Sequence, residues 1–148
     1  MDDIVLLGYP VRLGALQQQH HDEIVREFQL LSMSSPESRT GVPGRLLELV
    51  DLLTSTFAAE IAEPQRLRDE ALKSGAAQVD LRYPARPGMR EAVLAWDTML
   101  REVDDYCRQG TLLALAAPAE VVALRAWTMG EFLCQLDGQP PSPWSAPV

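Results

Sequence analysis

Apolar residues recur every three or four positions along most of the chain, and this spacing predicts amphipathic helices. The clearest case follows Gly88, where large apolar residues repeat at alternating intervals of four and three and form one continuous seam. The seam consists of Met89, Val93, Trp96, Leu100, Val103 and Cys107. Gly110 follows it, so we expect a helix that ends there.

Two opposite-charge pairs, Asp97 with Arg101 and Asp104 with Arg108, are spaced four residues apart on the expected surface side of this helix. Such exposed pairs contribute about 0.3–0.5 kcal/mol each. One large apolar side chain contributes roughly 1.5–3 kcal/mol when it is fully buried. The apolar seam, and not the charge pairs, is therefore expected to stabilise the helix.

Four further segments are predicted to be helical. They are Val11 to Met33, Pro43 to Ala62, a more polar segment that ends at Ser74 and Gly75, and Pro118 to Leu136. Pro64 is expected to kink the chain or to start a new helix, because proline has no backbone N–H to donate. A polar loop is expected from Ser34 to Pro43, and Thr111 is expected to cap a short turn from Leu112 to Ala116.

Three segments are predicted to be extended. The apolar run at residues 3–8 is expected to form an arm on the helices, because a lone strand would have no partner. Residues 78–87 contain Pro84 and Pro87, which disfavour helix. Residues 139–148 form a Pro-rich tail that either packs through Trp144 or hangs free. The predicted fold is an all-α bundle of five helices (four to six), with one domain at residues 1–138, the extended N-terminal arm and this tail.

The helical periods also predict which side chains face inward. In the first helix, the expected core face consists of Leu16, His20, Ile24, Phe28 and Leu31, and His21 is expected in solvent. The last helix is apolar nearly all round. Its narrow polar stripe is expected at the surface and consists of Arg125, Thr128, Glu131 and Gln135.

The chain has 148 residues, with 13 lysines and arginines against 21 acidic residues, and a formal net charge of −8. This balance disfavours nucleic acid and anionic membrane surfaces as partners, because cations supply most of that binding. No apolar run approaches the roughly 20 residues that span a bilayer. The acidic start, Met1-Asp2-Asp3, differs from a secretory signal, so a cytoplasmic location is expected.

We find no constellation of residues that indicates catalysis, a cofactor or a metal. His20, Glu23 and Glu27 share one side of the first helix, but no second set of ligands faces them. Cys107 and Cys134 are expected to be buried small apolar residues. Neither a nucleophile elbow nor a phosphate-binding loop is present in the sequence. A non-enzymatic protein without cofactors is therefore expected.

Residue types that dominate protein interfaces occur near both ends of the chain. The candidate partner-binding residues are Tyr9, Arg12, Arg125, Trp127 and Glu131. The alternative is that Trp127 belongs to the core and that Arg125 and Glu131 form a solvated face.

Both ends of the chain also resemble a known family. The segments from Leu6 to Gly14 and from Val121 to Trp127, then Gly130-Glu131-Phe132 and Pro140 to Trp144, resemble small uncharacterised actinobacterial proteins. Members are often encoded beside partner-switching regulators, namely anti-sigma-factor kinases, their STAS-domain antagonists and PP2C-type phosphatases. The resemblance implies a pathway and no mechanism.

The preferred hypothesis is a helical adaptor that docks a regulatory kinase, phosphatase or STAS-domain protein. A second hypothesis is a small-molecule sensor with an apolar pocket lined by Trp96, Trp127 and Met129. A third is a homodimer that pairs through the seam of the helix that begins at Met89.

Overall fold

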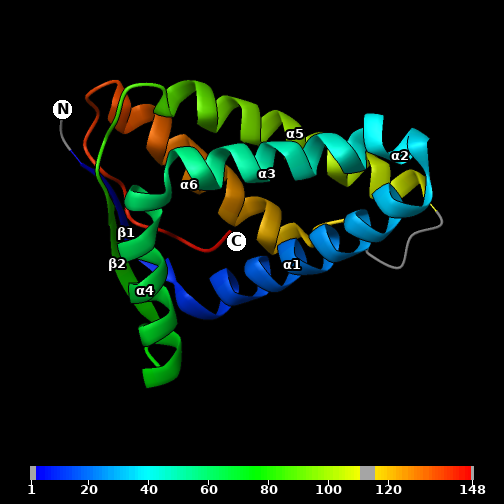
Figure 1. The fold of residues 1–148 in the computed structure, drawn as a ribbon. Helices are drawn as coiled ribbons and strands as arrows, with labels where there is room; N and C mark the ends of the chain where they lie inside the picture. Colours follow the sequence, from blue (N-terminus) through cyan, green and yellow to red (C-terminus); the bar gives the residue numbers. More distant parts are fainter. Residues whose placement is uncertain (1–2, 111–115, 148) are drawn as a thin grey trace.

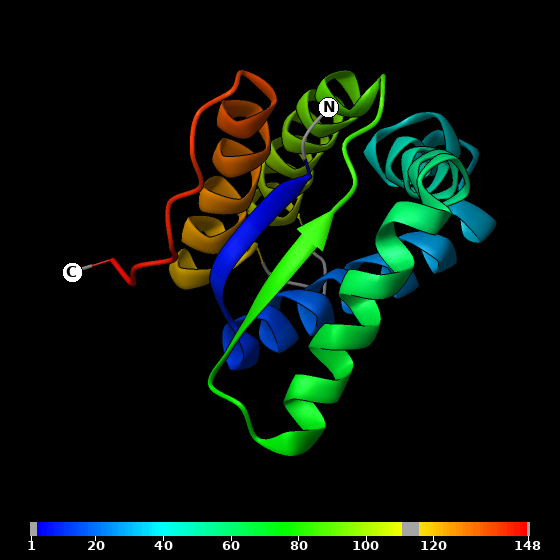
Figure 2. The ribbon, with the colours of Figure 1, turned by 90° about the vertical axis from the view of Figure 1, so that its left-hand side faces the viewer.

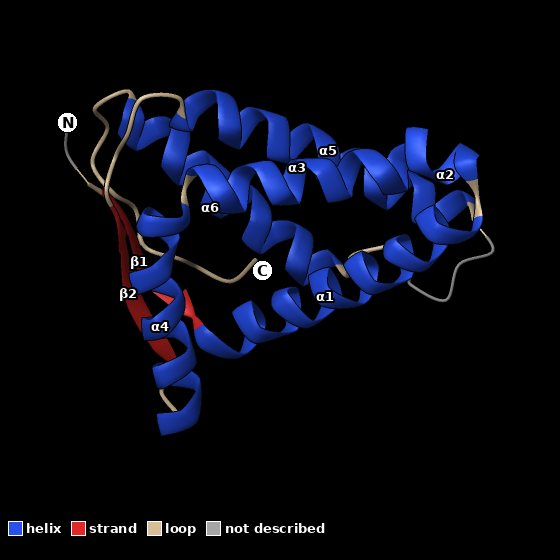
Figure 3. Cartoon of the chain, viewed as in Figure 1, coloured by secondary structure: helices blue, strands red, loops and turns tan. Residues whose placement is uncertain are grey.

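A computed structural model describes residues 3–110 and 116–147, and these residues are mostly helical, with one small sheet (Figures 1 and 3). The elements are β1 (Ile4–Pro10), α1 (Val11–Ser34), α2 (Pro36–Thr40), α3 (Val42–Thr56), α4 (Ala58–Ser74), β2 (Gln78–Tyr83), α5 (Met89–Gln109) and α6 (Ala119–Leu136). The expected turn at residues 112–116 falls almost wholly on residues 111–115, outside the described part of the chain.

Helices α1, α3, α5 and α6 form the body of the molecule. Helix α3 packs against α5 and α1, and α6 packs against α5 and α1 from the other side. The two strands and α4 close one end of this body, and α2 lies at the opposite end (Figure 1). Seen from that closed end, the strands cross between α6 on one side and α4 on the other (Figure 2).

The first strand corrects the prediction of a purely helical fold with an unpaired arm. β1 pairs antiparallel with β2, which places Ile4 opposite Tyr83 and Leu6 opposite Leu81. Ile4, Leu6 and Leu81 are fully buried. The register shifts between Leu6 and Tyr9, where Gly8 adopts a φ of +66°, a left-handed conformation that favours glycine. The partner of the arm is thus the second segment that was predicted to be extended.

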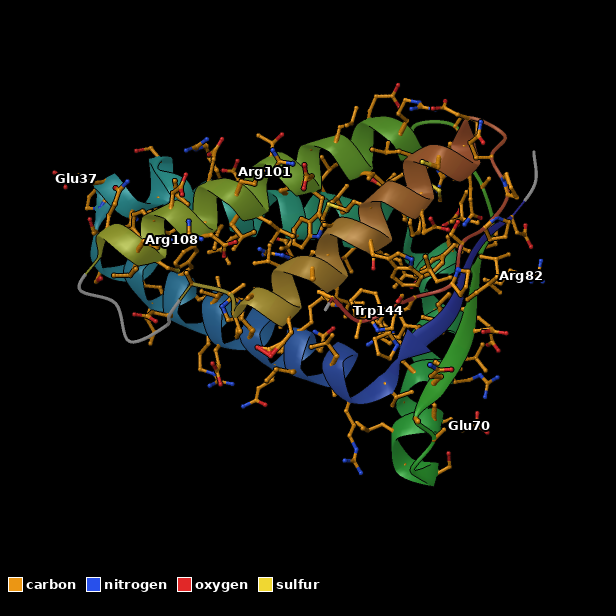
Figure 4. All side chains as sticks on the ribbon, turned by 180° about the vertical axis from the view of Figure 1, so that it is seen from behind. Glu37, Glu70, Arg82, Arg101, Arg108 and Trp144 are labelled. Atoms are coloured by element: carbon orange, nitrogen blue, oxygen red, sulfur yellow. The ribbon has the colours of Figure 1, made fainter. Side chains whose placement is uncertain are left out.

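The other edge of β1 is covered by a side chain and by the C-terminal tail. The amide of Gln135 accepts from the Val5 N–H at 2.8 Å and donates to the Val5 carbonyl at 2.8 Å. The Trp144 N–H donates to the Leu7 carbonyl at 2.9 Å. The tail therefore packs through Trp144, which lies against the molecule in Figure 4, and it protects an edge that would otherwise present unpaired backbone groups.

The new helix begins after Phe57, and not at Pro64, which was one of the two outcomes that the sequence predicted for that proline. α3 ends at Thr56, and α4 runs through Pro64, which is fully buried inside the helix. Phe57 is 9% exposed and packs in a cluster with Ile4 and Met89. Tertiary packing of the Phe57 ring thus fixes where α3 ends and α4 begins.

The loop expected between the first two helices contains the short helix α2. The Ser35 hydroxyl accepts from the Ser38 N–H at 3.4 Å, and Pro36 occupies the first helical turn. Serine as the N-cap followed by proline is a common way to begin a helix.

The inward face of α1 is rotated from the expected one. Ile24 and Phe28 are buried as predicted and pack with residues of α3 and α5. Leu16, by contrast, is 40% exposed. The side chains that turn inward beside Ile24 are Gln17 and His21, both of them half-buried and polar.

Candidate functional site

A cavity of about 320 Å³ that is open to solvent on one side lies among the helices, and we call it the aromatic cavity. Its lining comes from β2 and from every described helix except α2. The lining residues are Gln17, His21, Val50, Leu53, Thr54, Phe57, Glu60, Ile61, Tyr83, Met89, Ala92, Val93, Trp96, Arg125, Thr128, Met129 and Phe132. Its volume falls in the range of pockets that hold small organic molecules.

Four aromatic side chains form much of the wall. They are Phe57, Tyr83, Trp96 and Phe132. Tyr83 and Phe132 meet edge to face, with ring centroids 5.0 Å apart. Burial raises the pKa of Tyr83 to about 12, so its phenol is neutral at physiological pH. The wall is therefore apolar and rich in π faces.

Three buried polar atoms in this wall have no hydrogen-bond partner among the described residues. They are Gln17 Oε1, Glu60 Oε2 and Thr128 Oγ1. The fourth such atom, Ser32 Oγ, does not line the cavity. A buried polar group without a partner costs about 1–3 kcal/mol, so three at one cavity call for an explanation.

The Glu60 carboxylate binds an outer cation through one of its two oxygens. Its Oε1 atom accepts from Arg86 Nη1 at 3.3 Å, and its Oε2 atom is the one without a partner. The Arg86 guanidinium also donates to the Thr56 carbonyl and lies 5.3 Å from the centroid of the Phe57 ring. The side chain of Glu60 is only 14% exposed, whereas that of Arg86 is 45% exposed. Arg86 thus binds Glu60 from the solvent side.

Arg125 lines the cavity but is already paired. Its guanidinium donates to Asp104, which also accepts from the Ala117 N–H at 3.3 Å. The predicted surface pair of Asp104 with Arg108 is therefore wrong, and Arg108 pairs with Asp105 at 2.9 Å instead. The other predicted pair, Asp97 with Arg101, is confirmed at 2.9 Å. Arg101 and Arg108 project outward in Figure 4.

His21 was expected in solvent, and this expectation is wrong. Its ring meets Trp96 edge to face at 5.7 Å, and both side chains line the cavity. Burial is the main cause that lowers the pKa of His21, with His20 adding to the decrease and Asp22 opposing it. His21 is therefore neutral at pH 7.

A second cavity of about 360 Å³ adjoins the first. It shares six of its lining residues with the aromatic cavity, which are Gln17, His21, Thr54, Ile61, Trp96 and Arg125. Its remaining wall is more polar and includes Gln65 and Arg68 of α4.

The structure brings three of the five candidate partner-binding residues together, namely Tyr9, Trp127 and Glu131. Tyr9 is 4% exposed and lies 6.5 Å from the half-buried Trp127, and Arg12 is exposed nearby in sequence. Glu131, 9% exposed, accepts from the Ser142 N–H of the tail at 2.8 Å. Arg125, also 9% exposed, faces the cavity. That a protein partner binds these residues stays a prediction.

The polar stripe of α6 was expected at the surface, yet it lies against the rest of the chain. Thr128 and Arg125 line the cavity, and Gln135 and Glu131 bind β1 and the tail. The exposed residues of this helix instead include Cys134, which was expected to be buried.

The sequence suggested a pocket lined by three residues, and the structure places two of them in one cavity. Trp96 and Met129 line the aromatic cavity, whereas Trp127 packs on Trp144 with ring centroids 5.5 Å apart. The unpartnered side chains, Glu60 among them, were not predicted. Polar residues at otherwise apolar helical positions were the one signal that could have found Gln17 and Thr128.

Within residues 3–110 and 116–147, no group of three or more His, Cys, Asp or Glu side chains is placed to hold a metal ion. No helix in this part of the chain has both the length and the apolar character needed to cross a bilayer. Comparison with models of protein families, with curated proteins and with solved structures finds no match. The resemblance to the actinobacterial family therefore stays a prediction.

Proposed function

We propose that this chain is a helical ligand-binding domain that senses a small organic molecule in the aromatic cavity. The observation that carries the proposal is that three residues in the lining of this cavity, Gln17, Glu60 and Thr128, each contain a buried polar atom without a hydrogen-bond partner among the described residues. The same function was an alternative on the sequence alone, and the geometry now favours it over docking by the five candidate surface residues.

The physical argument concerns the surface that a ligand would cover. The lining is largely apolar, and contact with an apolar ligand removes such surface from water. A ligand that fills about 320 Å³ also gains dispersion contacts with the aromatic side chains of the wall. Because the lining comes from both ends of the sequence, such a ligand would stabilise the whole fold.

A thermal-shift screen with a library of small organic molecules tests the proposal. At a ligand concentration 100 times its dissociation constant, binding stabilises a folded protein by about 2.7 kcal/mol, which raises Tm measurably. We expect hits whose shift is lost in Ala92→Leu, because the larger side chain fills space beside the ligand. Ala95→Leu is the matched control, since Ala95 is an exposed residue of the same helix and lies outside the lining. No hits, or hits insensitive to Ala92→Leu, would remove the proposal.

The adaptor remains a second candidate, because one observation supports it. The half-buried rings of Trp127 and Trp144 pack on each other beside the buried Tyr9, and Arg12, three residues after Tyr9 in the sequence, is exposed. In this proposal the chain works in the cytoplasm on a regulatory kinase, phosphatase or STAS-domain partner. Co-purification with Arg12→Glu and Trp127→Ala tests it: unchanged capture by both variants would exclude this surface. Arg125→Glu is unsuitable, because it would break a buried ion pair.

The homodimer has less structural support. The seam of α5 packs inside the chain, where Met89, Val103 and Cys107 are all less than 9% exposed. A dimer would need another surface, and light scattering that shows only a 16.4 kDa species would exclude it.

A further inference from the structure

We infer that the ligand of the aromatic cavity is a protonated amine on an apolar body, and that Glu60 recognises the amine. This inference rests on the proposed function and specifies the chemical class of the ligand.

The first argument is the type of atom that lacks a partner. An ionised carboxylate can only accept hydrogen bonds, whereas a hydroxyl such as that of Thr128 can donate or accept. The amide of Gln17 can rotate to present either its oxygen or its nitrogen. Of the three groups, only Glu60 is acidic, and it is the one acidic residue in the described lining, so it favours a ligand that carries a hydrogen-bond donor.

The second argument is the balance of charge around the cavity. Arg125 is bonded to Asp104, and His21 is neutral because burial lowers its pKa. Arg68 lies in the wall of the adjoining cavity and not in this lining. Arg86 holds Glu60 from the solvent side, through Oε1. A carboxylate ligand placed beside Glu60 would meet a like charge, whereas an ammonium group would give Glu60 a second cation in addition to Arg86.

The third argument is the wall that surrounds this carboxylate. Trp96, Tyr83 and Phe132 line the same cavity, and aromatic rings of this kind attract organic cations. Met89 and Met129 add flexible apolar surface that adapts to the shape of the body. The cavity therefore suits a ligand with one donor end and an otherwise apolar surface.

Three probes of similar size and different end group test the inference by isothermal titration calorimetry in phosphate buffer. They are phenethylamine, phenethyl alcohol and hydrocinnamate, which present an ammonium, a hydroxyl and a carboxylate. Because a hydrogen bond to a charged partner is the stronger kind, we expect phenethylamine to bind at least about tenfold more tightly than the alcohol. Hydrocinnamate should bind most weakly of the three.

Three variants then assign the effect to Glu60. Glu60→Gln keeps the shape of the side chain, removes its charge, and should weaken phenethylamine binding by about 10- to 100-fold. Glu63→Gln makes the same change at an exposed site of α4 and should leave binding unchanged. Arg86→Gln removes the outer ion pair but keeps the carboxylate, so it should also retain binding. Circular dichroism and Tm show whether each variant folds.

The outcomes separate this inference from the proposed function. If the alcohol or hydrocinnamate binds as tightly as the amine, and Ala92→Leu abolishes that binding, the inference of an amine ligand is wrong. The proposal that the cavity binds a small molecule is then retained. If Glu60→Gln folds and binds phenethylamine like the wild type, the role of Glu60 is wrong. If none of the probes binds, the amine inference fails, and the proposed function then depends on the library screen alone.

Discussion

The guanidinium of Arg125 on α6 donates a hydrogen bond to the carboxylate of Asp104 on α5, with side chains only 10% and 6% exposed. Asp104 also accepts a hydrogen bond at 3.3 Å from the N–H of Ala117, which lies just before the start of α6. The pair joins two long helices beside the aromatic cavity and neutralises the one arginine in its wall. The charge of the cavity therefore depends on an interaction that also holds the fold together.

Asp104→Asn should lower the free energy of unfolding by about 3–5 kcal/mol, because it leaves the Arg125 charge buried without a counter-ion. Urea denaturation measures the loss. The control is Asp105→Asn, an exposed neighbour whose pair with Arg108 contributes little. The double variant Asp104→Leu with Arg125→Met should regain most of the stability, since it removes both charges together. A single variant as stable as the wild type would show that the pair is not buried as described.

The buried His21 predicts a pH dependence of stability. The pKa of His21 in the folded chain lies below the value near 6.5 of the unfolded chain. At a pH between the folded and the unfolded pKa, unfolding is therefore accompanied by uptake of a proton. Stability should be independent of His21 above about pH 6.5 and should fall as the pH drops below it. In His21→Gln, denaturation midpoints measured from pH 7.5 to pH 5 should decline less than in the wild type. Identical slopes in the two proteins would contradict the burial of His21.

Gln135→Glu should destabilise the fold by about 1–3 kcal/mol. A carboxylate cannot donate to the Val5 carbonyl, and it would place a second negative charge beside Glu131, which now accepts from Gln135 Nε2 at 3.1 Å. The control is Gln139→Glu, which makes the same change at an exposed residue just beyond α6. Thermal unfolding of the two variants gives the comparison, and equal Tm values would mean that Gln135 does not support the edge of β1.

The two cysteines should differ in reactivity. Cys134 is exposed, whereas Cys107 is 7% exposed and burial raises the pKa of its thiol to about 11. A thiol-specific reagent at pH 8 should label one cysteine in the folded chain and both in denaturant, since the thiolate is the reactive form. Cys134→Ser should remove the fast reaction. Fast labelling of that variant would show that Cys107 is accessible.

The sequence predicted the elements whose signal is local. The seam from Met89 to Cys107 and the helices around it followed from repeated spacing within one segment, and the seam is buried or half-buried as expected. The sheet was not predicted, because its partners, Ile4 to Pro10 and Gln78 to Tyr83, are about 70 residues apart and neither pairs alone. Both had been recognised as extended, so only the pairing was missing.

The site was harder to predict than the helices, for a physical reason. Periodicity assigns polar residues to solvent, but Arg125 and Gln135 face inward because Asp104 and the backbone of Val5 supply partners there. Such partners come from other elements and leave no trace in the local pattern. Likewise, Glu60 reaches the cavity only because the chain bends at Phe57, which tertiary packing determines.

Methyl NMR of protein labelled with ¹³C at the methionine methyl groups gives the most direct test of ligand binding in the aromatic cavity. Met89 and Met129 line the aromatic cavity, whereas Met99 packs in another cluster and Met33 is 82% exposed. On titration with the tightest binder from the library screen, we expect the signals of Met89 and Met129 to shift together and those of Met33 and Met99 to stay in place. If Met89 and Met129 do not move while the ligand binds, the cavity is not the binding site.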